Sequence, residues 1–176
     1  MKKSLQHHFA YPLADVVNLF LDADILCQMM VDLGNRDVSV TVEPKDDDRV
    51  DIAIIRTVSA DPPALIRAIT GDWVEVHQQE RWTGLAGAGE PDAAISVRMM
   101  MDPIGKPARG SGTLRFTEDA AGETRCAATV EVTCSVPLAA TLVERMIVSD
   151  SIELLSQQFG YVDRLLAERS SAARTG

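Results

Sequence analysis

The segment over residues 72–82 carries the residue types best suited to chemistry in this sequence. Apolar and polar residues alternate along it, which is typical of a β-strand with one covered face. If Val76 faces the covered side, then Gln78, Glu80 and Trp82 share that side, because side chains alternate along a strand. A carboxyl group in an apolar enclosure is costly to ionise, so Glu80 could act as a general acid or anchor a ligand.

Arg56 is a candidate partner of the Glu80 carboxylate. Arg56 shares the phase of Ile52 and Ile54 in the neighbouring segment, so its side chain can enter the same enclosure as a counter-charge for Glu80 or for a ligand carboxylate. Arg98 is the other candidate partner. Alternatively, Glu80 lies near the sheet end in contact with water, and Arg56 extends its charged group into solvent.

A long helix predicted over residues 138–169 contributes polar positions to the same enclosure. Asp150 and Ser151 fall between the apolar residues Ile147 and Leu154. Polar residues that interrupt an apolar stripe either line a pocket or mark the margin of the stripe, and the pattern allows both. At about 1.5 Å per residue the helix is roughly 45 Å long, enough to cross a sheet.

The sequence contains seven methionines, and several of them, including Met99 and Met146, fall at expected apolar positions. Flexible thioether side chains suit the wall of a cavity that takes ligands of imprecise shape, although methionine also fills ordinary cores.

No recognisable catalytic or cofactor motif occurs in the chain. The three histidines include the adjacent pair His7 and His8, whose side chains would point to opposite faces of a strand and so could not chelate one metal. The three cysteines have no metal-like spacing. Phosphate loops, nucleophile elbows and dinucleotide fingerprints are missing. We therefore expect no assignable catalytic residues, no metal and no cofactor.

Charge and composition favour one globular domain. The chain has 176 residues, with 17 Lys and Arg against 26 Asp and Glu, and a net charge of −9. Such a charge disfavours nucleic acid as a partner. The longest apolar run covers only residues 52–55, whereas a membrane-spanning helix needs about 20 residues, and the first residues do not form a secretion signal. We expect a cytoplasmic monomer or homodimer with one domain over residues 1–169 and a flexible tail over 170–176.

Periodicity along the chain indicates an α+β protein. A first strand and two short helices precede six strands with period-two alternation, and the long helix comes last. An antiparallel sheet with one dry face must cover that face, and the terminal helix is the only large amphipathic element available. The expected elements are strands at 5–11, 38–42, 52–58, 72–82, 93–101, 112–118 and 123–136, and helices at 13–20, 22–33, 64–68 and 138–169.

This order resembles the helix-grip fold of the START/SRPBCC superfamily, which includes birch-pollen-allergen-like proteins, polyketide cyclases and lipid-transfer domains. The chain is more closely similar to a bacterial domain-of-unknown-function family within it. The similar segments are 8–12 (HFAYP), 71–72 (GD) leading to 79–82 (QERW), and 134–138 (CSVPL). The resemblance implies a curved, seven-stranded antiparallel sheet around the C-terminal helix, with a hydrophobic-ligand cavity between them, and it supplies no catalytic residues.

The sequence therefore predicts a protein that binds or carries a small hydrophobic or amphipathic ligand, lipid- or polyketide-like, without inserting into membranes. Two other functions stay open: an enzyme of the cyclase, dehydratase or hydrolase kind using Glu80 in general acid-base catalysis, or a protein-interaction module. The predicted ligand-binding residues are Arg56, Val76, Gln78, Glu80, Trp82, Val97, Met99, Leu114, Phe116, Val130, Val132, Met146, Asp150 and Leu154.

Overall fold

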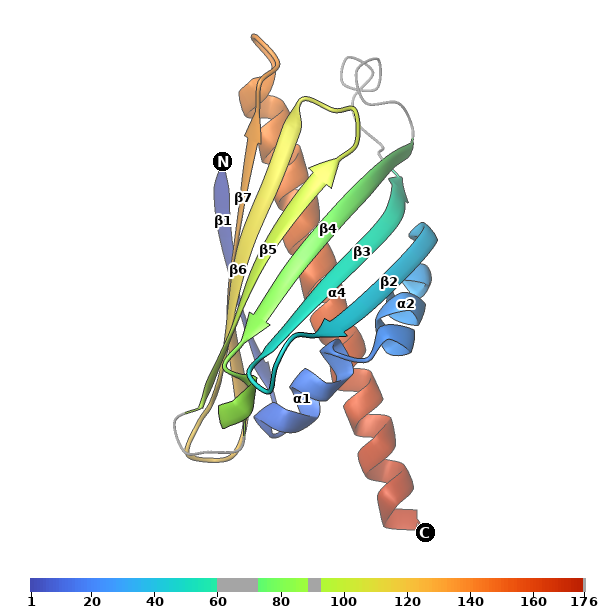
Figure 1. Ribbon diagram of the computed structural model, residues 1–176, viewed down its shortest axis with the longest axis vertical. Helices are drawn as coiled ribbons and strands as arrows, with labels where there is room; N and C mark the ends of the chain where they lie inside the picture. The colour runs from blue at the N-terminus through green and yellow to red at the C-terminus, as the bar shows by residue number, and fades with distance from the viewer. Residues whose placement is uncertain (60–72, 89–92, 176) are drawn as a thin grey trace.

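A curved antiparallel sheet of seven strands dominates the computed structural model, which describes residues 1–59, 73–88 and 93–175. The strand order is β1-β7-β6-β5-β4-β3-β2, so the chain's first strand lies beside its last (Figure 1). The strands are β1 (Lys2–Phe9), β2 (Arg36–Pro44), β3 (Arg49–Ser59), β4 (Trp73–Thr83), β5 (Ala94–Pro103), β6 (Ala108–Glu118) and β7 (Thr124–Cys134).

Helices cover one face of this sheet. The short helices α1 (Leu13–Phe20) and α2 (Ala23–Asp32) follow β1, and the long helix α4 (Ala140–Thr175) crosses the back of the sheet from one end to the other (Figure 1). A single 3-10 turn, η1 (Leu85–Gly87), follows β4. The structure has the helix-grip fold that the sequence predicted.

Local sequence signals explain where α2 starts and stops. The Asp22 carboxylate accepts hydrogen bonds from the backbone N–H groups of Asp24 and Ile25, both at 3.0 Å, which satisfies donors that have no partner inside the helix. The helix ends just before Gly34, whose φ of 88° places it in the left-handed region that glycine adopts without steric cost.

Aromatic side chains fill the space between sheet and helices at the α1 end of the molecule. Trp82 stacks on Phe116 with ring centroids 5.6 Å apart, and Phe20 packs against both of these rings and against Phe159 of α4. All four side chains are buried, and burying each contributes about 1.5–3 kcal/mol or more to stability. This end of the interior is a close-packed core.

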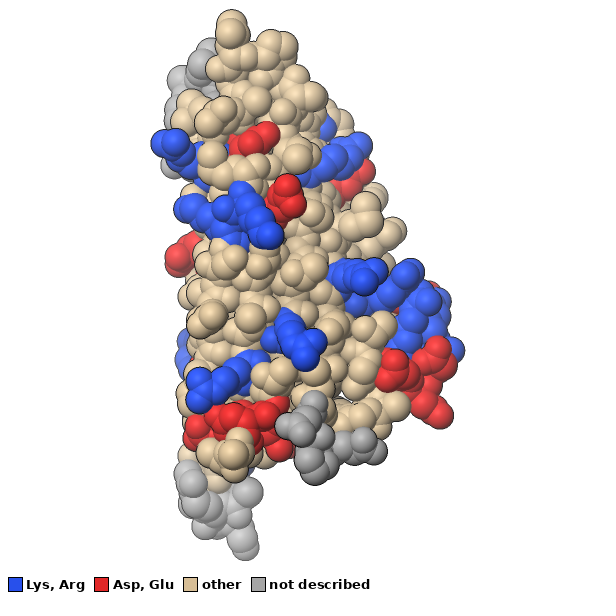
Figure 2. Space-filling view, turned by 90° about the vertical axis from the view of Figure 1, so that its left-hand side faces the viewer, with Lys and Arg blue, Asp and Glu red and all other residues tan. Residues whose placement is uncertain are grey.

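The opposite face of the sheet is polar. Figure 2 shows Lys and Arg side chains, with Asp and Glu among them, along the side of the molecule formed by β1 and its neighbours. Arg81, Arg109 and Arg125 are each more than half exposed. In the described ranges, no helix combines the length and the apolar character needed to cross a membrane.

Several element boundaries differ from those predicted. β6 begins at Ala108 rather than at residue 112, because Gly110 and Gly112 on its inner face carry no apolar side chain to signal the alternation. β1 lies a few residues earlier than predicted, β7 ends at Cys134 rather than at residue 136, and α4 continues to Thr175, into the predicted tail. The helix predicted over 64–68 lies outside the described residues.

Candidate functional site

A cavity of about 340 Å³ lies between the sheet and α4, at the end of the molecule away from the aromatic core. α4 packs against β7 and β1, and α2 packs against β2, so neither helix closely covers the inner face of the middle strands at this end. The residues facing one another here are also small. Ala108, Gly110, Val132 and Val143 line the space, and they cannot fill it as the rings do at the other end.

The lining of the cavity is predominantly apolar. Besides the small residues, it includes Val58, Val74, Val76, Met101, Pro103, Val136, Ile147 and Leu154, with Leu33 from the end of α2. Among the described residues, the charged groups on its wall are Arg56, Lys106, Arg109 and Asp150.

These charged groups differ sharply in burial. Arg56, on β3, is 4% exposed, whereas Arg109 is 62% exposed and pairs with Asp102. Asp150 is exposed as a whole, and its partial burial in the cavity wall raises the pKa of its carboxyl group. Arg56 therefore marks the buried end of the cavity, and Arg109 and Asp150 mark its solvent-facing rim.

A buried hydrogen-bond chain continues from Arg56 along the inner face of β4. Arg56 Nη1 donates to Gln78 Oε1 at 2.8 Å, and Gln78 Nε2 donates to Glu80 Oε1 at 2.5 Å. The other Glu80 oxygen, Oε2, accepts from Trp82 Nε1 at 2.8 Å. Each of the two carboxylate oxygens thus has a donor, as a polar group in a covered site requires.

Burial shifts the pKa of both charged groups in this chain. Loss of water around Arg56 lowers its pKa to about 10, although the nearby Glu80 acts in the opposite direction. For Glu80, burial has the opposite result and raises the pKa of the carboxyl group. The hydrogen bonds from Trp82 and Gln78 and the positive charge of Arg56 each lower this pKa, but burial has the larger effect. At neutral pH Arg56 keeps its positive charge.

Comparison with known proteins places this architecture in a family. The family described as protein of unknown function, DUF2505, matches residues 4–166. The chain belongs to this family. No curated protein matches the sequence.

Comparison with solved structures identifies the fold of the DUF2505 chain. TTHA0849 from Thermus thermophilus is 17% identical, with a TM-score of 0.60, over 96% of this chain and 99% of that one. A protein of unknown function from Staphylococcus aureus, SA2116, is 9% identical, with a TM-score of 0.60, over 97% and 96%. Ara h 8.0201, a Bet v 1-like protein, is 13% identical, with a TM-score of 0.54, over 92% and 97%. The DUF2505 chain therefore has the Bet v 1-like helix-grip fold.

The structure brings only some of the predicted ligand-binding residues of the DUF2505 chain to the cavity. The phase predicted for β4 is confirmed, because Val76, Gln78 and Trp82 are buried while their neighbours Glu75 and Gln79 are exposed. The predicted residues that line the cavity are Arg56, Val76, Val132, Asp150 and Leu154.

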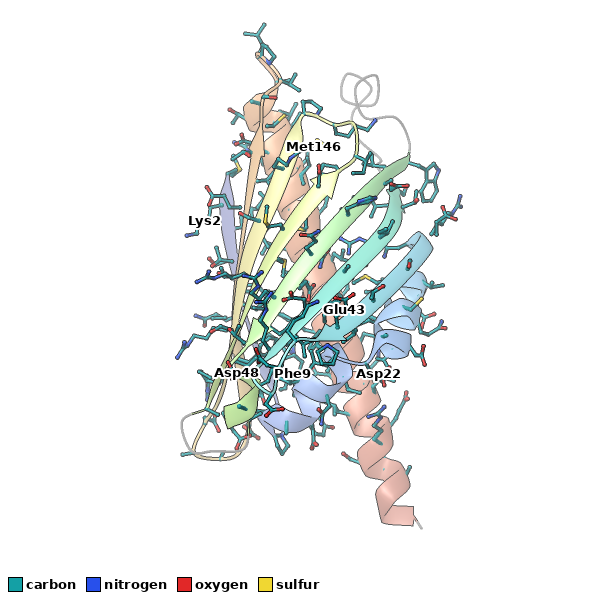
Figure 3. All side chains as sticks on the ribbon, viewed as in Figure 1. Lys2, Phe9, Asp22, Glu43, Asp48 and Met146 are labelled. Carbon is teal, nitrogen blue, oxygen red and sulfur yellow. The ribbon has the colours of Figure 1, made fainter. Side chains whose placement is uncertain are left out.

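The remaining predicted residues lie elsewhere. Five of them border a separate internal void of about 20 Å³, too small for a ligand: Glu80, Trp82, Val97, Met99 and Leu114. Phe116 and Val130 belong to the packed core, and Gln78 bridges Arg56 and Glu80. Met146 does not contribute to the cavity lining and lies near the start of α4, at the opposite end of the molecule from Phe9 and Asp22 (Figure 3).

The cavity wall also contains residues that were not among those predicted from the sequence. Met101 and Val74 were in phase with the predicted inner faces, so alternation alone could have found them. Leu33 and Pro103 come from the ends of elements, where periodicity carries little information. No local signal in the sequence shows that the end of α2 and the turn between β5 and β6 border the same cavity.

Two other features are weaker candidates for a functional site. A depression of about 400 Å³ on the outer side of the sheet is lined mainly by polar and charged residues such as Arg81 and Arg98, and it offers less apolar surface than the cavity does. In the described part of the chain, ligand atoms of His8, Asp119 and Glu123 lie within 4.8 Å of one another. Asp119 already pairs with Arg125 and accepts from backbone N–H groups.

Proposed function

We propose that this protein binds, and so can carry, a small hydrophobic or amphipathic molecule in the cavity between the sheet and α4. The observation that carries the proposal is the cavity itself, with its largely apolar wall and few polar groups. Its volume of about 340 Å³ lies within the range of small-molecule sites. A lipid- or polyketide-like ligand fits this chemistry.

The fold supports the same proposal. Proteins of the SRPBCC superfamily typically bind hydrophobic ligands, and the helix-grip architecture explains how. The aromatic core packs the sheet against the helices at one end of the molecule, and this packing stabilises the domain even though the other end contains a cavity. A ligand can therefore bind in the cavity while the domain stays folded.

A fluorescent fatty acid whose emission increases in apolar surroundings tests this function. We expect saturable 1:1 binding to the protein, with the negative heat-capacity change that accompanies burial of apolar surface. The Ile147→Trp substitution places a larger side chain at the cavity wall and should weaken binding by about tenfold or more, because the probe and the indole compete for one space.

Leu142→Trp is the matched control for this substitution. Leu142 lies on the same helix but is 45% exposed and does not belong to the cavity wall, so binding should remain unchanged. Circular dichroism establishes that both variants are folded. Absence of saturable binding across a panel of fatty acids and related amphiphiles, or equal binding by the two variants, would contradict the proposal.

The enzymatic alternative receives less support from the geometry. Glu80 faces inward, as acid-base catalysis would require, but its carboxylate does not border the cavity, and Gln78 and Trp82 occupy both of its oxygens. A substrate in the cavity would not reach it within hydrogen-bond distance, as a general acid or base must. The cavity also argues against the interaction module, for which a solid interior is expected.

A further inference from the structure

Arg56 is a buried cation without a carboxylate in direct contact among the described residues. Its Nη1 contacts the amide oxygen of Gln78 at 2.8 Å and the sulfur of Met30 at 3.7 Å. Both contacts use neutral acceptors, and Glu80 is reached only through Gln78. Arginine is rarely buried to this extent without a paired anion.

The Nε of Arg56 has no hydrogen-bond partner in the described structure. An unsatisfied buried donor is uncommon in folded proteins, since it forfeits its hydration without any replacement. Nε also belongs to one of the guanidinium edges that bind a carboxylate through two parallel hydrogen bonds. The side chain therefore combines a buried charge that has no directly bonded anion among the described residues with an unused donor on a carboxylate-binding edge.

Arg56 is part of the cavity wall and lies opposite Val76 in the register of β3 and β4. The wall around it includes the apolar residues Val58, Val74 and Val76. With Arg109 and Asp150 at the exposed rim, Arg56 is the deeply buried charged group of the lining. A molecule with an apolar body and one anionic end could contact the apolar wall and bind the Arg56 guanidinium at the same time.

We infer that the ligand is an amphipathic carboxylic acid whose carboxylate binds Arg56 at the buried end of the cavity while its apolar body contacts the remaining wall. This inference rests on the proposed function and adds the head group of the ligand and its orientation. A carboxylate supplies the anion that Arg56 lacks and accepts from Nε. Glu80, bound to Gln78 and Trp82, stays in place as part of the supporting structure.

Paired ligands of equal chain length test the inference. Dodecanoic acid and 1-dodecanol share the same apolar body, but only the acid carries a charge at pH 7.5. Wild-type protein should bind the acid about tenfold or more tightly, as expected for a charge-assisted hydrogen-bonded pair. Arg56→Met, which keeps an apolar side chain of similar length, should reduce this preference to about twofold or less. The control variant Arg125→Ala removes an exposed arginine that does not belong to the cavity wall and should retain the preference.

A spectroscopic measurement avoids dependence on the folding of the Arg56 variant. The side-chain Nε–H resonance of Arg56 in the wild-type nitrogen-15 spectrum should shift downfield when dodecanoic acid binds and stay in place with 1-dodecanol. Equal affinity for the two ligands, an unchanged preference in folded Arg56→Met, or an unmoved resonance with bound acid would overturn the inference while leaving the proposed function intact. Failure of both ligands to bind would overturn the proposed function itself.

Discussion

Single residues in the interior of this protein illustrate how burial changes the role of a charged group. The period-two pattern of β3 and β4 allowed two interpretations: Arg56 and Glu80 together in the interior, or Glu80 in contact with water and Arg56 extended into solvent. In the structure Arg56 is buried and is linked to Glu80 through Gln78. The sequence could not show that Gln78 separates them or that Glu80 faces a small void while Arg56 faces the cavity. Those differences depend on side-chain packing against α2 and α4, which alternation does not encode.

The raised pKa of Glu80 predicts how stability changes with pH. Burial favours the protonated form of Glu80 in the folded state. Proton binding to Glu80 therefore stabilises the folded state fully below about pH 4.5, the ordinary pKa of glutamate. This stabilisation disappears as pH rises through the higher pKa that Glu80 has in the folded state. The free energy of unfolding of wild type, relative to Glu80→Gln, should therefore decrease over that interval. Urea denaturation at steps between pH 4 and pH 8 measures it.

Glu131→Gln serves as the control, because it removes a carboxylate from the exposed face of β7. A difference between wild type and Glu80→Gln that stays constant with pH, or increases as pH rises, would be incompatible with a proton held by burial.

At the scale of helices and strands, most of the architecture was predictable because each element has its own periodic signal. Val130 and its in-phase neighbours defined β7, and the three-and-four spacing around Phe159 defined α4. The start of β6 was not predictable, since Gly110 and Gly112 give no hydrophobic signal. The close contact that requires glycine at position 112, where an added Cβ would lie 2.8 Å from Met99 Cγ, exists only in the folded sheet.

The N-terminal cap of α2 gives a prediction at this scale. The Asp22→Ala substitution removes the carboxylate that accepts hydrogen bonds from the backbone N–H groups of Asp24 and Ile25. It should lower the free energy of unfolding by about 1 kcal/mol. Chemical denaturation measures the change. Asn18→Ala, at an exposed position of α1, is the control and should alter stability by less than about 0.5 kcal/mol. Equal effects from the two substitutions would show that Asp22 contributes nothing as a cap.

For the molecule as a whole, the division of its interior into two ends matters most for function. Rings from α1, β4, β6 and α4 fill one end, and small residues leave space at the other. The sequence predicted a sheet around a helix with room between them, but it placed the ligand among residues of both ends. Which end is filled depends on where α1 and α2 meet the sheet, a long-range property that no local pattern expresses.

Intermolecular nuclear Overhauser effects between isotope-labelled protein and unlabelled dodecanoic acid locate the bound ligand, because they report which methyl groups the acyl chain contacts. If the ligand occupies the cavity between the sheet and α4, we expect cross-peaks from the acyl chain to the methyl groups of Val76, Val132 and Leu154 on the cavity wall. Cross-peaks confined to the exposed Ile55 and Met100, or none with a saturating amount of the acid, would contradict this placement of the ligand.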